Sequence, residues 1–103
     1  MRDGVIIVFF DLPVKSNTEK KAYRDFRNYL LREGYRSLQK SVYFKYLRNM
    51  SMADYYIKDL EVNSPQTGEI FTLCSNYKCF KSMYAISGEL PDFDKIRSPV
   101  IIL

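Results

Sequence analysis

The chain is organised around the stretch Val5-Ile6-Ile7-Val8-Phe9-Phe10-Asp11-Leu12-Pro13. Its first six residues are all apolar and four of them are β-branched, a run that is too short for a membrane helix and lacks polar alternation. Such a run predicts a strand that is covered on both faces, at the centre of a sheet. Asp11 then lies where the strand leaves the sheet, and Pro13 ends the pairing because it has no amide hydrogen to donate.

Asp11 has two interpretations at this position. An aspartate just before a proline turn often accepts hydrogen bonds from nearby backbone amides, which is a purely structural role. Alternatively, it is a functional carboxylate at the end of the central strand. The chain contains no histidine, so mechanisms that need an imidazole base are excluded. Any catalysis must therefore use carboxylates, lysine, tyrosine or a metal ion.

Length and composition predict one domain over residues 1–103, with a core over about 5–75 and a C-terminal extension over 76–103. The net charge of +4 permits nucleic acid as a partner. Cys74 and Cys79 are predicted to be reduced thiols in the core, since no histidine completes a zinc site. With no leader pattern and no apolar run of membrane length, we expect a cytoplasmic protein that does not contact a membrane.

The segment after Pro13 predicts a helix to about Glu33. Ser16 and Glu19 have the spacing of a capping box, and Asn17 and Thr18 are rival caps. Gly34 is placed to end it in the left-handed conformation. The buried stripe at helical spacing consists of Ala22, Phe26, Tyr29 and Leu30. Three cations, Lys20, Arg24 and Arg27, share a neighbouring face, which is either an ordinary solvated surface or a nucleic-acid contact.

The rest of the core predicts a hairpin over residues 35–47, a second helix and a fourth strand. The second strand of the hairpin covers Ser41–Tyr46, and the helix runs from a Ser51–Asp54 capping box to about Val62. Its predicted apolar face is Ala53, Tyr56, Ile57 and Leu60. The turn Asn63–Gly68 precedes the strand Glu69–Ser75. This order, βαββαβ, predicts an α+β ferredoxin-like fold with both helices on one face of an antiparallel sheet.

The C-terminal extension is less regular. Residues 77–83 predict one short helical turn, Tyr84–Ser87 a short strand and Glu89–Arg97 a polar linker. The chain then ends on Val100, Ile101, Ile102 and Leu103, and an apolar strand left unpaired recruits another chain. We expect this end to pair with a partner; the alternative is that it packs on its own sheet.

Several motifs of the first half resemble a known family. They are Phe10-Asp11-Leu12-Pro13 after an apolar strand, Glu19-x-Lys21-Ala22-Tyr23-Arg24-x-Phe26-Arg27-x-Tyr29-Leu30, Gly34-Tyr35 and Gln39-x-Ser41-Val42-Tyr43. In this order and spacing they are similar to the second CRISPR-associated protein family, the small adaptation subunit, and most similar to its variant from single-effector, type II systems.

The resemblance implies a homodimer in which the C-terminal strand of each chain completes the sheet of the other. It also implies a role in spacer acquisition, where the dimer bridges copies of the adaptation integrase and holds double-stranded DNA. The family is credited with magnesium-dependent endonuclease activity on RNA or DNA. Asp11 is the residue carried over as its catalytic residue and metal ligand.

Ligand counting and charge extend these expectations. One carboxylate is too weak a site for magnesium, so we expect a two-fold dimer to hold one Mg²⁺ between two copies of Asp11. DNA phosphates are expected to contact basic residues of the first half, which are Lys20, Arg24, Arg27, Arg36, Lys40, Lys45 and Arg48.

Three alternatives stay open. One is a stand-alone metal-dependent endoribonuclease or endodeoxyribonuclease. Another is an RNA-recognition-type domain, which shares the same strand order, although its Lys/Arg-Gly-aromatic signature is missing here. The last is a small acyl-phosphate hydrolase, whose phosphate-binding loop this chain lacks.

Overall fold

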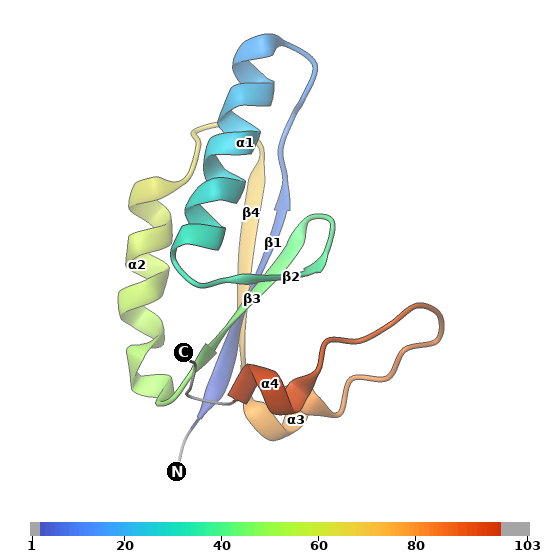
Figure 1. Cartoon of the computed structure of the whole chain (residues 1–103). Helices are drawn as coiled ribbons and strands as arrows, with labels where there is room; N and C mark the ends of the chain where they lie inside the picture. Colours follow the sequence, from blue (N-terminus) through green and yellow to red (C-terminus); the bar gives the residue numbers. More distant parts are fainter. Residues whose placement is uncertain (1–2, 98–103) are drawn as a thin grey trace.

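The computed structural model describes residues 3–97 and has an α+β architecture, with a sheet, two long helices and two short ones (Figure 1). The elements are β1 (Gly4–Asp11), α1 (Asn17–Arg32), β2 (Arg36–Gln39), β3 (Val42–Leu47), α2 (Ala53–Asn63), β4 (Glu69–Asn76), α3 (Tyr77–Lys81) and α4 (Phe93–Arg97). A short 3-10 turn, Met50–Met52, precedes α2. None of the helices in the described part is long and apolar enough to cross a membrane.

The four strands form one antiparallel sheet in the order β2-β3-β1-β4. The apolar strand β1 therefore lies between two neighbours, with Val5 opposite Tyr46 of β3 and opposite Ser75 of β4. The prediction of a ferredoxin-like fold around a central first strand is confirmed. β4 is an edge strand of this sheet within the described residues.

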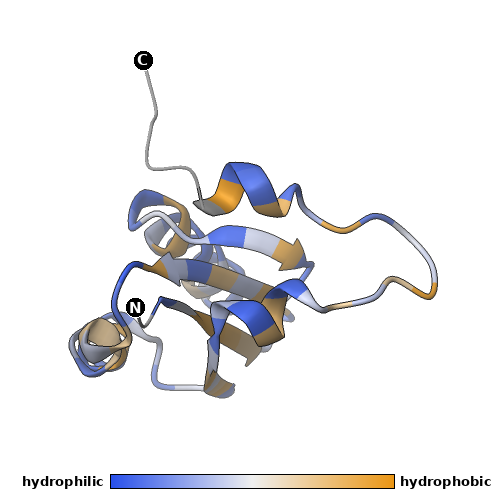
Figure 2. Cartoon of the chain, turned by 90° about the horizontal axis from the view of Figure 1, so that it is seen from below, coloured by the Kyte–Doolittle hydropathy of each residue, from blue (hydrophilic) through white to orange (hydrophobic). Residues whose placement is uncertain are grey.

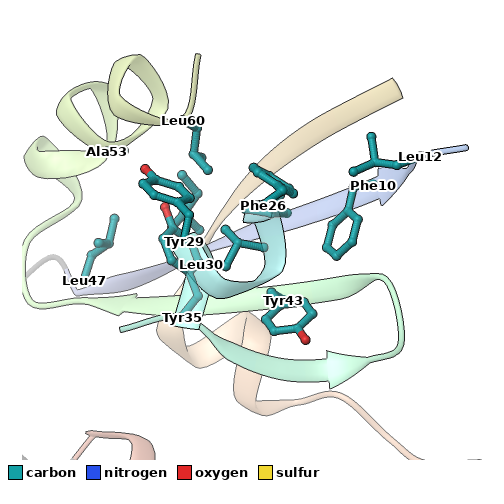
Figure 3. Packing of buried hydrophobic residues seen from close by; sticks show 12 residues of the cluster. Phe10, Leu12, Phe26, Tyr29, Leu30, Tyr35, Tyr43, Leu47, Ala53 and Leu60 are labelled. Carbon is teal, nitrogen blue, oxygen red and sulfur yellow. The ribbon is translucent and has the colours of Figure 1, made fainter. Parts of the chain in front are cut away.

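One face of the sheet is covered by α1 and α2, and we call it the helix-covered face. Alternate residues of β1 (Ile6, Val8 and Phe10) point into this core, where Phe26 and Leu30 of α1 meet them. Figure 3 shows these residues in one cluster between the sheet and the two helices, with Phe26 next to Phe10 and with Leu30 and Leu60 contributed by α1 and α2. The predicted stripes are confirmed, because the residues that they name are buried or partly buried against this cluster, with Ala22 half-buried.

The limits of α1 also agree with the sequence. The Glu19 N–H donates to Ser16 Oγ at 3.1 Å, and the Ser16 N–H donates to Glu19 Oε1 at 3.0 Å, which is the predicted capping box. Backbone N–H groups of Ser16 and Lys15 lower the pKa of the Glu19 carboxyl. Gly34 has a φ of 92°, the left-handed conformation that favours glycine.

The predicted cap of α2 is wrong. The side chain of Asn49 accepts a hydrogen bond from the Ser51 N–H at 3.0 Å and opens the 3-10 turn that runs into the helix. α2 itself begins without a side-chain cap. An asparagine bonds readily to the backbone two residues on, so Asn49 takes the place predicted for Ser51.

The opposite face of the sheet carries two short helices. One is α3, which confirms the short helical turn predicted over residues 77–83, and the other is α4, which was not predicted. Tyr77, Phe80 and Ile96 pack there against the other set of alternating residues, including Val5 and Ile7. The linker predicted over Glu89–Arg97 in fact ends in α4. The Asp92 side chain accepts hydrogen bonds from backbone N–H groups in the first turn of that helix. The ring centres of Phe80 and Phe93 are 5.6 Å apart.

Two further predictions for the C-terminal part need correction. Tyr84–Ser87 forms no strand, and this segment lies in an irregular loop that extends away from the sheet in both views (Figure 1, Figure 2). Cys79 is exposed instead of being a core thiol, whereas Cys74 is half-buried; both are free. The predicted C-terminal strand, Val100–Leu103, lies outside the described residues.

Candidate active site

Asp11 is the last residue of β1 and is exposed. Strand alternation places it on the same face as Val5, Ile7 and Phe9, opposite to the helix-covered face. Within residues 3–97 its carboxylate has no hydrogen bond or ion pair. A turn-capping aspartate would bond a nearby backbone amide, so the geometry favours the functional interpretation of Asp11.

Glu69 lies directly opposite Asp11 in the pairing of β1 with β4. Directly opposed residues of antiparallel strands project on the same face, so the two carboxylates are neighbours. Both line an open hollow of about 280 Å³ together with Phe9 and Phe71. Glu69 was not among the residues predicted from the sequence. The predicted fold could have indicated it, because a ferredoxin-like sheet pairs the start of the last strand with the end of the first.

Gly68 holds the start of β4 against Asp11. It has a φ of 84°, and a Cβ at this position would lie 2.7 Å from the Asp11 carbonyl oxygen. Only glycine fits such an approach without a shift of the backbone. The close contact between Gly68 and Asp11 thus fixes the backbone just before Glu69, the residue that faces Asp11.

The hollow adjoins an uncovered apolar part of the sheet, which we call the open face and define by Phe9, Phe71 and Leu73. Their side chains are 37%, 64% and 56% exposed, and Phe9 lies directly opposite Phe71. α3 and α4 cover Val5 and Ile7 at the other end of β1 and leave this end uncovered. The carboxylate pair therefore lies at the margin of an apolar surface.

The donor set at this position suits a hard cation. Magnesium prefers oxygen ligands, of which proteins often supply one or two carboxylates, while water and substrate phosphate complete the octahedron. Asp11 and Glu69 would supply two carboxylates from one chain. No cluster of three or more His, Cys, Asp or Glu that could hold an ion occurs over residues 3–97.

The three predicted cations of α1 share its outer surface. Lys20, Arg24 and Arg27 are exposed on the side away from the buried Phe26. Within the described part of the chain, the ion pair on this helix joins two other residues, Lys21 Nζ and Asp25 Oδ2, at 2.7 Å. The charges of the three cations are therefore available to a ligand.

The other exposed cations are spread over the sheet. Lys40 is in the turn between β2 and β3, at the same end as Asp11, since the Phe10 N–H donates to the neighbouring Ser41 carbonyl at 3.0 Å. Arg36 lies on the edge strand β2, and Arg48 follows β3 at the end of the sheet opposite to Asp11. The structure therefore brings only Lys40 of these three near the carboxylates.

Lys45 differs from the other predicted contacts. It lies on the helix-covered face, half-buried, with its Nζ 5.8 Å from the ring centre of Tyr35 and 5.1 Å from that of Tyr56. The ammonium group donates to the Glu33 carbonyl at 2.7 Å, and burial lowers the pKa of Lys45. The alternation of side chains along β3 could have predicted this placement, because Lys45 shares a face of the strand with the buried residues Tyr43 and Leu47.

Comparisons with known proteins give one consistent result. The family model described as CRISPR associated protein Cas2 matches residues 4–83. A protein of Treponema denticola named CRISPR-associated endoribonuclease Cas2 is 39% identical over 82% of this chain and 83% of its own length. A protein of the same name from Streptococcus mutans is 42% identical over 82% of this chain and 78% of its own length. Another, from Acidovorax ebreus, is 39% identical over 87% of this chain and 87% of its own length.

Proposed function

Because this chain belongs to the Cas2 family of CRISPR-associated proteins, we propose that it is a homodimeric adaptation subunit that binds double-stranded DNA and bridges the integrase during spacer acquisition. We also propose that it cleaves phosphodiester bonds with magnesium. The observation that carries the proposal is the end of β1, where an exposed carboxylate without a bonding partner in the described chain adjoins the open face.

The open face supports a dimer of this chain. Phe9, Phe71 and Leu73 form a continuous apolar surface on paired strands, and such surfaces are usually buried against a partner. Among residues 3–97, β4 is an edge strand of the sheet, and such an edge can accept another strand. We assign residues 100–103 of a second copy to that edge. The alternative is that this C-terminal segment pairs with the integrase. A two-fold axis at the open face would bring the two copies of Asp11 toward each other.

Cleavage would depend on Asp11 and on a magnesium ion shared between the two protomers. When bound, magnesium lowers the pKa of its water and polarises a phosphoryl oxygen, which supplies hydrolytic chemistry to a chain without histidine. The two Asp11 carboxylates would hold the ion and orient it. The related proteins are named endoribonucleases, which favours RNA as one substrate, and the proposal also includes DNA.

The DNA contact is assigned to the outer surface of α1. Lys20, Arg24 and Arg27 are exposed there, and cations that contact phosphates bind without regard to base sequence. The affinity should therefore fall steeply as salt rises and change little between duplexes of different sequence. Arg36, Lys40 and Arg48 are exposed and extend the proposed contact, whereas the ammonium group of Lys45 already serves the end of α1.

A matched pair of double variants tests this footprint. Arg24→Glu/Arg27→Glu reverses two charges on α1, and Lys78→Glu/Lys81→Glu makes the same change in net charge on exposed residues of α3. Fluorescence anisotropy with a duplex at low salt should show about tenfold weaker binding for the first variant and little change for the second. Equal losses would mean that only net charge matters, and an unchanged affinity of the first variant would refute the α1 footprint.

Deletion of residues 99–103 tests the assignment of the C-terminus. We expect a weaker dimer by sedimentation velocity or weaker capture of the integrase in a pull-down. A truncated protein with parental dimer mass and parental capture would show that this segment serves neither partner.

The placement of the aromatic residues argues against an RNA-recognition-type domain. That module stacks bases on aromatic residues of two central strands. Here Phe9 is on the central strand β1, but its exposed partner Phe71 is on the edge strand β4. The residue opposite Phe9 on the other central strand is Val42, which is half-buried.

The second candidate function is therefore the stand-alone metal-dependent nuclease, which the names of the relatives favour.

A further inference from the structure

Glu69 and Asp11 form a like-charged pair that nothing in the described chain neutralises. They are directly opposite in the antiparallel pairing of β1 with β4, and both are exposed. Neither carboxylate has a hydrogen bond or ion pair within residues 3–97. Directly opposed side chains have Cβ atoms about 5 Å apart, and like charges at this separation are destabilising.

The backbone around the pair leaves it little freedom to separate. Gly68 approaches the Asp11 carbonyl so closely that a Cβ would lie 2.7 Å away, and it needs a φ of 84° to do so. This contact fixes where β4 begins and therefore which residue faces Asp11. A shift of one residue would turn Glu69 to the helix-covered face, because side chains alternate along a strand.

We propose that Glu69 is a second ligand for the divalent cation that the proposed function assigns to Asp11. Each protomer would then contribute two carboxylates instead of one. The inference rests on the proposed metal site and adds to it a residue from a different strand. A cation between the two groups would remove their repulsion, and the paired strands would hold both oxygen donors in place before the ion binds.

The test measures ion binding directly, without reference to cleavage. Mn²⁺ is titrated into the full-length protein and its free concentration is followed by electron paramagnetic resonance, for the parent, Asp11→Asn, Glu69→Gln and Glu89→Gln. The last variant is the matched control, because Glu89 is an exposed glutamate in the loop that extends away from the sheet. We expect affinity to fall about tenfold or more in Glu69→Gln, with no change in Glu89→Gln.

The outcomes separate this inference from the proposed function. If Asp11→Asn loses the ion and Glu69→Gln keeps parental affinity, Glu69 is not a ligand and the Asp11 site stands. If the parent binds no Mn²⁺, or if Asp11→Asn binds as the parent does, the metal site itself is wrong and this inference fails with it.

A second measurement uses stability in the absence of metal. With a chelator present, Glu69→Gln should raise the melting temperature relative to Glu89→Gln, because it removes the cross-strand repulsion. Added Mg²⁺ should then raise the melting temperature of the parent more than that of Glu69→Gln. Equal responses of these two proteins to Mg²⁺ would contradict the proposed ligand.

Discussion

The two faces of the sheet are built from the same strands but differ in how much of their apolar surface is covered by helices. On the helix-covered face, Ile6, Val8 and Phe10 of β1 are buried under two long helices. On the opposite face, α3 and α4 cover Val5 and Ile7 but leave Phe9 exposed next to Asp11. β1 therefore contributes to the folding core on one face of the sheet, and its uncovered end contributes the candidate site on the other face.

The largest expected effect is on the helix-covered face. Phe26 is 1% exposed and its ring meets that of Phe10 at 5.3 Å, so Phe26→Ala would leave a cavity in the core. We expect the free energy of unfolding to fall by about 3–5 kcal/mol. Urea unfolding followed by circular dichroism measures it. A loss below about 1 kcal/mol would show that this face does not carry the stability.

A substitution on the open face should change the dissociation constant of the dimer and leave the stability of the folded chain nearly unchanged. Phe71→Ala removes an exposed ring, 64% accessible in the single chain, that we assign to the dimer interface. The loss of buried apolar area should weaken the dimer by about 2 kcal/mol, or about thirtyfold. Sedimentation velocity over a range of concentrations measures the dissociation constant. A dimer of parental strength would place the interface elsewhere.

The main elements could be predicted because their signals are local. The run Val5–Phe10 marked a central strand, and the Ser16–Glu19 box and Gly34 marked both ends of α1. The apolar face of α2 followed from its spacing. In each case the information lies within a few residues, so tertiary contacts had little left to decide.

The remainder depends on contacts between distant residues. α4 forms because Phe93 and Ile96 find partners on the sheet, and Glu69 becomes part of the candidate site only through its register with Asp11. Lys45 is basic like the other predicted DNA contacts, but its position on β3 directs it toward the end of α1. Composition and spacing within one segment do not contain these pairings.

The same substitution should affect different properties at Lys45, on the helix-covered face, and at Arg27, on the outer surface of α1. Lys45→Met removes the donor to the Glu33 carbonyl, at a helix end where carbonyls lack partners, and should cost about 1.5 kcal/mol of stability. Arg27→Met, on the exposed surface of α1, should change stability by less than about 0.5 kcal/mol and weaken duplex binding. Urea unfolding and fluorescence anisotropy measure the two properties. The reverse pattern would contradict the placement of Lys45.

The smallest effect concerns the start of α1 and depends on pH. Hydrogen bonds from the backbone of Ser16 and Lys15 lower the pKa of Glu19 in the folded state below its ordinary value of 4.5. A carboxyl whose pKa is lowered by folding stabilises the protein above that ordinary value, and the contribution is lost as the pH falls through the folded value. Glu19→Gln should therefore lower stability at pH 7 and match the parent more closely near pH 3. A difference that does not depend on pH in urea unfolding would refute this.

Asp11→Asn tests whether the uncovered end of β1 is a metal-dependent nuclease site. The substitution keeps the shape of the side chain and removes its charge. We measure cleavage of single-stranded RNA and duplex DNA with Mg²⁺, with Glu89→Gln as the control, and check fold and dimer mass in the same preparations. We expect Asp11→Asn to abolish Mg²⁺-dependent cleavage while the fold, the dimer and DNA binding persist. Cleavage by Asp11→Asn at the parental rate would contradict it.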